Sequence, residues 1–164
     1  MCGIFGVYGT EHAAEVTHLG LYSLQHRGQE SAGIVAVDGD SVARGTRKMG
    51  LVGEGLSARE MESLAGRIAI GHTRYSTAGS STIENAQPVL ARFKGGHIAL
   101  AHNGNLTNAV EVRAKLEDSG SIFASTMDSE VIVHRLARAA EALPEHMLAE
   151  ALRGIEGAYC LVVI

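Results

Sequence analysis

The chain opens with MCGIFGVYG (residues 1–9), an apolar β-type run with a cysteine directly behind the initiator methionine. Gly3, Gly6 and Gly9 allow close backbone approach, so the run predicts a buried strand. The initiator methionine is removed when the second residue is small, which would leave a thiol and a free α-amine together on Cys2. A nucleophile beside its own potential base is one way to activate a weak nucleophile. Cys2 is therefore either an N-terminal nucleophile or a small residue that merely precedes a strand.

Strand and helix signals alternate along the rest of the chain. Hairpin-like turns such as Asp38-Gly39 are more prominent than regular βαβ units, so the sequence predicts the α+β class with largely antiparallel sheets. Ser57 followed by Glu60 predicts a capping box at one helix start. Expected strands cover 3–9, 31–50 (a hairpin), 67–77, 97–108 (a strand that runs into a loop) and 157–164, and expected helices cover 13–25, 56–66, 108–120, 128–142 and 144–155.

Composition narrows the class of protein. A length of 164 residues suggests one domain, and a net charge of −4 argues against nucleic acid as a partner. The chain has no apolar stretch long enough to span a membrane and no signal peptide pattern, which predicts a cytoplasmic protein without a membrane partner. Two cysteines make no disulfide framework, and Cys160 is expected to be a small buried hydrophobe. Because the chain stops inside an apolar β run, we expect it to be a piece of a longer protein.

Polar, glycine-containing motifs stand out where packing does not explain them. They are the first candidates for a functional site, because loops at strand ends present side chains from a rigid scaffold. The Asn103-Gly104 pair, taken alone, is more typical of a turn. His26, His72 and His102 flank the motifs but match no metal-ligand spacing, so no metal site is expected. The motifs are LQHRGQESAG (24–33), GHTRYSTAG (71–79), AHNGNLTN (101–108) and STMDSE (125–130).

These motifs, in this order, resemble the glutaminase domain of the class II, N-terminal-nucleophile glutamine amidotransferases. MCGIFG, GHTRYST and HNGNL carry the resemblance to the class. LQHRGQESAGI, GSSTIENAQP and HNGNLTN carry a narrower resemblance to the amidophosphoribosyltransferase family of purine synthesis. The resemblance covers nearly all of residues 1–164. It implies the N-terminal-nucleophile hydrolase fold, a four-layer αββα sandwich of two mainly antiparallel sheets between helices.

The resemblance also implies catalytic roles for three residues. Cys2 would attack the side-chain amide of glutamine to give a thioester and ammonia, with its own α-amine moving the proton. Asn103 and Gly104 would form the oxyanion hole, the first through its side-chain amide and the second through its backbone N–H.

Further residues are implied to bind glutamine. Arg74 would clamp the α-carboxylate, since guanidinium binds carboxylate bidentately, and Thr77 would add a hydroxyl contact. Asp128 would pair with the α-ammonium, although a helix N-cap is the simpler interpretation of an aspartate at that place. Arg27 and Gly28 would shape the pocket floor. His72 and His102 are expected to be hydrogen-bonded residues that support the site.

In the family that the chain resembles, a C-terminal domain transfers the ammonia to phosphoribosylpyrophosphate. The acidic phosphoribosyl-binding loop of that domain has no counterpart in residues 1–164, and the glutaminase domain itself looks incomplete at its C-terminus. No cofactor is expected in this segment; Mg²⁺ and, in some relatives, an iron–sulfur cluster would belong to the missing part, and the full-length enzyme is expected to be a homo-oligomer. Two alternatives stay open: another class II amidotransferase (of the sugar-phosphate, asparagine or glutamate synthase type), or an inactive truncated fragment.

Overall fold

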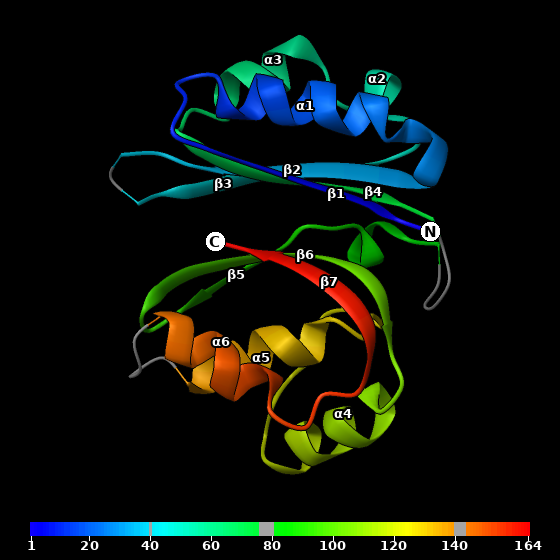
Figure 1. Ribbon diagram of the computed structural model, residues 1–164, viewed down its shortest axis with the longest axis vertical. Coiled ribbons are helices and arrows are strands. Elements are labelled where there is room, and N and C mark those ends of the chain that lie inside the picture. The colour runs from blue at the N-terminus through cyan, green and yellow to red at the C-terminus, as the bar shows by residue number, and fades with distance from the viewer. Residues whose placement is uncertain (40, 76–80, 140–143) are drawn as a thin grey trace.

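Two antiparallel sheets lie face to face, and helices cover the outer face of each (Figure 1). This computed structural model describes residues 1–39, 41–75, 81–139 and 144–164. The α+β class and the two antiparallel sheets predicted from the sequence are confirmed. The N-terminus lies at one end of the paired sheets, beside the start of the first strand (Figure 1).

The first sheet has the strand order β1-β4-β2-β3, and all its pairings are antiparallel. The second sheet has the order β5-β6-β7, also antiparallel. The strands of the first sheet are β1 (Gly3–Tyr8), β2 (Ser31–Val37), β3 (Ala43–Met49) and β4 (Ile68–Arg74), and those of the second are β5 (Val89–Phe93), β6 (Gly96–Leu106) and β7 (Gly157–Val163).

One group of helices covers each sheet (Figure 1). The first sheet carries α1 (Ala13–Ser23), α2 (Val52–Gly55) and α3 (Ala58–Ser63), and the second carries α4 (Ala109–Asp118), α5 (Glu130–Arg138) and α6 (Pro144–Leu152). Two short 3₁₀ turns, η1 (Gln25–Arg27) and η2 (Ile83–Asn85), lie in the connections. The predicted capping box is confirmed at α3: the Ser57 side chain accepts from the Glu60 N–H, and the Glu60 carboxylate accepts from the Ser57 N–H at 2.9 Å.

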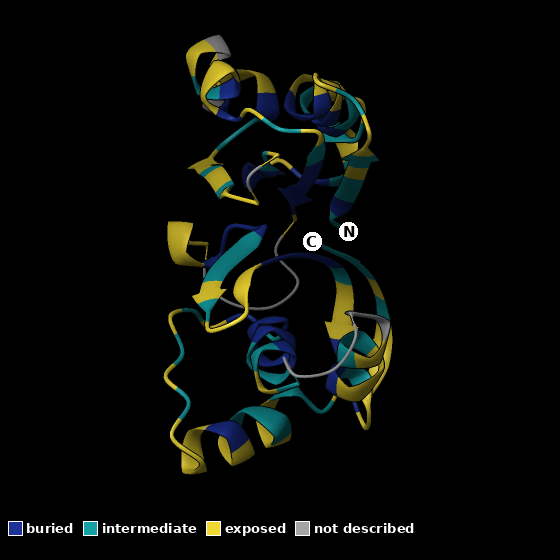
Figure 2. Ribbon diagram, turned by 90° about the vertical axis from the view of Figure 1, so that its left-hand side faces the viewer, coloured by how far each residue is buried: buried dark blue, intermediate teal, exposed yellow. Residues whose placement is uncertain are grey.

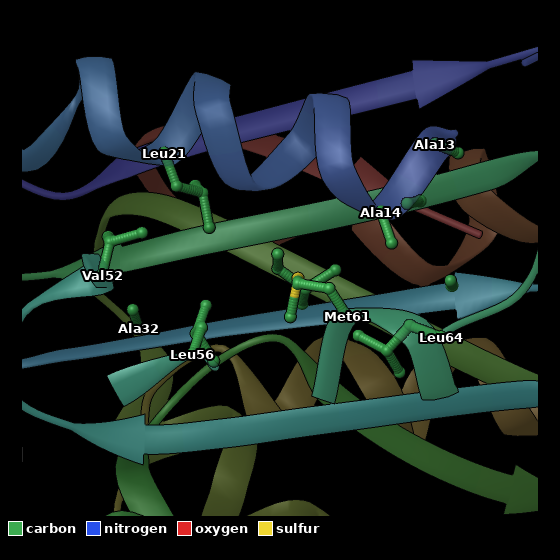
Figure 3. Close-up of a cluster of buried hydrophobic side chains, with 11 residues drawn as sticks. Ala13, Ala14, Leu21, Ala32, Val52, Leu56, Met61 and Leu64 are labelled. Carbon is green, nitrogen blue, oxygen red and sulfur yellow. The ribbon is translucent and has the colours of Figure 1, made fainter. Parts of the chain in front are cut away.

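The core is divided into clusters between successive layers. Buried residues line the inner faces of the helices and the space between the sheets, while exposed residues lie outside (Figure 2). Figure 3 shows the cluster between the first sheet and its helices, where Leu21 of α1 and Met61 of α3 meet the sheet. Ile70 and Ala101 belong to the cluster between the two sheets. Both sheets therefore pack on two faces.

Two expectations about burial need correction. The first strand is only partly buried, and Tyr8 is 84% exposed, because β1 is an edge strand of its sheet. Cys160 is exposed rather than buried, since β7 is also an edge strand.

Candidate active site

One small pocket gathers residues from five separate parts of the chain. Its volume is about 20 Å³, which is roughly the room that a single water molecule needs. Four residues predicted from the sequence, Cys2, Arg74, Gly104 and Asp128, line it together. The complete lining is Cys2, Arg74, Tyr75, Gln87, His102, Gly104, Met127 and Asp128. Residues up to 126 positions apart in sequence numbering therefore face one another only because the two sheets stack.

Cys2 lies directly before β1 and is partly exposed. Its Sγ atom is 3.6 Å from the carbonyl oxygen of Tyr75, which follows β4. The Arg27 Nε–H donates to the Cys2 carbonyl oxygen at 3.0 Å. Gly28 packs directly on the backbone of Arg74, where a Cβ atom would lie 2.6 Å from the carbonyl carbon. Arg27 and Gly28 thus lie beside the N-terminal segment, but neither is part of the pocket lining, so their role as a pocket floor stays a prediction.

Arg74 is a buried cation at the end of β4, only 3% exposed. Its Nη1 atom donates to the Glu30 carboxylate at 2.7 Å. A charge-assisted pair of this kind is stronger than a neutral hydrogen bond, and it compensates the buried guanidinium. Glu30 was not among the predicted site residues. The signal was present in the motif HRGQES, where the only carboxylate is Glu30.

Asn103 and Gly104 lie within the continuous strand β6, so the turn interpretation and the expected loop are both wrong here. Gly104 has φ +148°, and a Cβ atom there would lie 2.2 Å from the Ala158 carbonyl oxygen on β7. The position therefore requires glycine. Alternation along the strand places Asn103 on the same face as Ala99 and Ala101, which pack between the two sheets. Gly104 lines the pocket, whereas Asn103 lies next to it in the strand.

Asp128 lies two residues before α5, and its carboxylate is held by backbone donors. Oδ2 accepts from the Leu106 N–H at 3.0 Å and Oδ1 from the Ser129 N–H at 2.7 Å. Oδ1 also lies 3.6 Å from Nδ1 of His102. Burial by itself raises the pKa of the Asp128 carboxyl, but the His102 ring and the backbone donors together outweigh burial and lower it. Asp128 is thus an anion fixed in the pocket wall, and it also binds the N–H of Ser129, the N-cap residue of α5.

His72 and His102 connect the two sheets behind the pocket. The Nε2 atom of His72 on β4 is 3.0 Å from the carbonyl oxygen of His102 on β6. Burial lowers the pKa of His72 to about 3, so its ring is neutral at physiological pH and donates this hydrogen bond. His72 is thus hydrogen-bonded, as expected, and its supporting role in the site stays a prediction. His26 lies elsewhere, with Nδ1 3.1 Å from the Ser23 carbonyl oxygen on the surface.

Three lining residues, Tyr75, Gln87 and Met127, were missed by sequence reasoning. Gln87, in the motif ENAQP, accepts a hydrogen bond through Oε1 from the His102 N–H at 2.7 Å. Met127 is buried beside Asp128. Thr77 lies outside the described residues. Across the ranges 1–39, 41–75, 81–139 and 144–164, no group of three or more His, Cys, Asp or Glu side chains is placed to hold a metal ion.

Comparisons with known proteins place these features in a family. The family described as a glutamine amidotransferase domain matches residues 72–164. The chain is 48% identical over 164 residues to an amidophosphoribosyltransferase of Lacticaseibacillus casei, a match that covers 99% of this chain and 84% of that one. It is 46% identical to the chloroplastic amidophosphoribosyltransferase 2 of Arabidopsis thaliana, over 99% of this chain and 29% of that one.

A solved structure described as the allosteric regulatory enzyme of purine biosynthesis matches all of this chain with a TM-score of 0.92 and 42% identity. That match covers 35% of the solved chain. The chain thus spans about a third of the solved structure and of the Arabidopsis relative. None of the helices described is long and apolar enough to cross a membrane. Because a chloroplastic form is among the relatives, the cytoplasmic location stays a prediction.

Proposed function

This chain belongs to the glutamine amidotransferase domain family, as the domain of an amidophosphoribosyltransferase, and from that membership we propose that it hydrolyses glutamine with Cys2 as the nucleophile. One observation carries the proposal: Cys2, Arg74, Gly104 and Asp128 line a single pocket. The thiol matches the side-chain amide of glutamine, the cation its α-carboxylate and the anion its α-ammonium. The backbone N–H matches the oxyanion that forms during the reaction. The layered sheets are, on this proposal, those of an N-terminal-nucleophile hydrolase.

The first step is attack of the Cys2 sulfur on the side-chain carbonyl carbon of glutamine. The thiol proton passes to the α-amine of the same residue, and the resulting tetrahedral oxyanion is bound by the backbone N–H of Gly104 and the side-chain amide of Asn103. Collapse breaks the C–N bond, the amine returns the proton to the leaving nitrogen, and ammonia departs from a thioester. Water then hydrolyses the thioester to glutamate and frees the thiol.

The α-amine becomes available only when Met1 has been removed. Met1 is 71% exposed, so the peptide bond before Cys2 is accessible to an aminopeptidase. The Arg27 side chain donates a hydrogen bond to the Cys2 carbonyl oxygen, and this contact holds the new N-terminus in place when Met1 leaves. The geometry around Cys2 thus favours a processed N-terminus as the active form.

The two charged residues hold the ends of the amino acid. Arg74 binds the α-carboxylate, with Thr77 as a further hydroxyl contact, while the Asp128 anion binds the α-ammonium. The pocket has room for about one water molecule. In the longer protein, the ammonia serves the reaction for which the relatives are named, amidophosphoribosyl transfer in purine biosynthesis.

The test is covalent labelling of the purified protein with 6-diazo-5-oxo-L-norleucine, a glutamine analogue, followed by intact-mass measurement. The expected result is loss of Met1 and one adduct that Cys2→Ala abolishes. Cys160→Ala is the matched control, because Cys160 is the only other cysteine of the chain, and it should leave the adduct unchanged. An adduct that follows Cys160, or no adduct on the protein, would overturn the assignment and favour an inert fragment.

A further inference from the structure

The motif ENAQP plays no part in the chemistry above, yet its Asn85 is one of the most deeply buried polar side chains, 1% exposed. Asn85 ends the turn η2, where its N–H donates to the Thr82 carbonyl oxygen at 3.1 Å. The next carbonyl, that of Ala86, accepts from the Arg47 guanidinium on β3 at 2.9 Å. The Asn85 backbone is therefore fixed relative to the first sheet.

The Asn85 side chain reaches the segment that carries Asp128. Its Oδ1 accepts from the Thr126 N–H at 3.0 Å, and its Nδ2 donates to the Thr126 Oγ1 at 2.8 Å. One amide thus binds both the backbone and the side chain of the residue two positions before Asp128. A two-point contact fixes orientation as well as position, because it restrains the rotation of the bound residue.

The segment needs such a contact, because residues 121–129 belong to no helix or strand. Their placement depends on side chains. The Glu130 carboxylate accepts from the Ala124 and Ser125 N–H groups at 2.8 and 2.9 Å, which fixes the early part of the segment. Asn85 fixes the part nearest to Asp128.

We propose that Asn85 is a positioning residue for the ammonium-binding carboxylate: through Thr126, it sets where Asp128 meets the substrate. The inference rests on the proposed function, since it assigns Asp128 to the α-ammonium of glutamine. Asn85 itself is absent from the pocket lining, so it acts through Asp128 and not on the substrate. Through Asn85, the ENAQP motif thereby connects the first sheet to Asp128, the proposed ammonium-binding carboxylate.

The test compares labelling of Cys2 by two reagents in a Cys160→Ala background. 6-Diazo-5-oxo-L-norleucine carries the α-ammonium and α-carboxylate of glutamine, whereas iodoacetamide carries neither. Thr126→Val removes the hydroxyl that accepts from Asn85 at nearly constant volume, and Thr126→Ser retains it. Asn85→Ala removes both contacts. If Asn85→Ala fails to fold, Thr126→Val tests the same contact with a smaller change.

The measured quantity is the concentration of the diazo reagent that gives half of the maximal labelling rate. In Asn85→Ala and Thr126→Val we expect this concentration to rise about tenfold, because each variant loses a buried hydrogen bond. The maximal labelling rate and the iodoacetamide rate stay unchanged, and Thr126→Ser behaves as the unsubstituted protein. In an Asp128→Ala background, Thr126→Val should have no further effect, because both changes remove the same interaction.

Two outcomes would overturn the inference. Equal loss of labelling by both reagents would show a general structural role, and an undiminished effect of Thr126→Val in Asp128→Ala would show that Thr126 acts elsewhere. Failure of the proposed function has a different signature. In that case, the unsubstituted protein itself takes no adduct from the diazo reagent at Cys2.

Discussion

Glu30 and Arg74 are joined twice, through their side chains and through their backbones. The Arg74 guanidinium donates to the Glu30 carboxylate at 2.7 Å, and the Glu30 N–H donates to the Arg74 carbonyl oxygen at 3.0 Å. Both side chains are largely buried, 4% and 16% exposed. The cation proposed to bind the substrate carboxylate is therefore held in place before any substrate arrives.

Glu30→Gln should lower the free energy of unfolding by about 2 kcal/mol, because a neutral amide replaces the buried partner of a buried cation. Urea denaturation of the variant beside the unsubstituted protein measures the change. Arg153→Ala breaks an exposed pair with Glu150 and serves as the control, with no measurable shift expected. An equal shift in both variants would contradict the buried-pair explanation.

Stability should decline in acid because of His72. Burial lowers the pKa of His72 to about 3 from an ordinary value of 6.5, so between these values the unfolded chain binds more protons than the folded one. The stabilisation is complete above about pH 6.5 and falls as the pH drops toward 3, by up to about 1.4 kcal/mol per pH unit.

Urea denaturation at several pH values checks this, with His72→Gln expected to flatten the slope between pH 6.5 and 4. His12→Gln is the control, since the His12 side chain is 75% exposed. An unchanged slope in His72→Gln would assign the acid sensitivity to other groups.

Gly104→Ala should weaken the pairing of β6 with β7. A methyl group at this position would overlap the Ala158 carbonyl oxygen, and the backbone has φ +148°, so the expected loss of stability is above about 3 kcal/mol. Gly120→Ala also places alanine at positive φ, +89°, but in open space, where about 1 kcal/mol is expected. Thermal unfolding measures the melting midpoint of each variant. Similar midpoints for the two variants would contradict the predicted steric overlap at Gly104.

An uncleavable extension before Cys2 should abolish glutamine hydrolysis. The extension blocks the α-amine that is proposed to move the proton, while the thiol stays in place. Ammonia release from glutamine measures activity, and alkylation of Cys2 by iodoacetamide shows that the thiol is still reactive. Full activity of the extended protein would require a different base.

Local features of this protein followed from short-range rules. The Ser57 and Glu60 spacing predicted the capping box, and the apolar runs predicted the strands other than β5, because both depend on residues close in sequence. The interpretation of the Asn103-Gly104 pair as a turn is wrong for the same reason. Local preference favours a turn there, but pairing with β7 holds both residues in an extended strand.

The sequence by itself determined the family, the α+β class and the chemical types of the site residues: a thiol at position 2, a guanidinium at 74 and a carboxylate at 128. Only the tertiary structure decided which other residues contact the residues in and around the site. Glu30 on Arg74, Asn85 on Thr126 and Gln87 on His102 are contacts across 15 to 44 positions. Such contacts follow from the stacking of two sheets and their connecting segments, which no local pattern encodes.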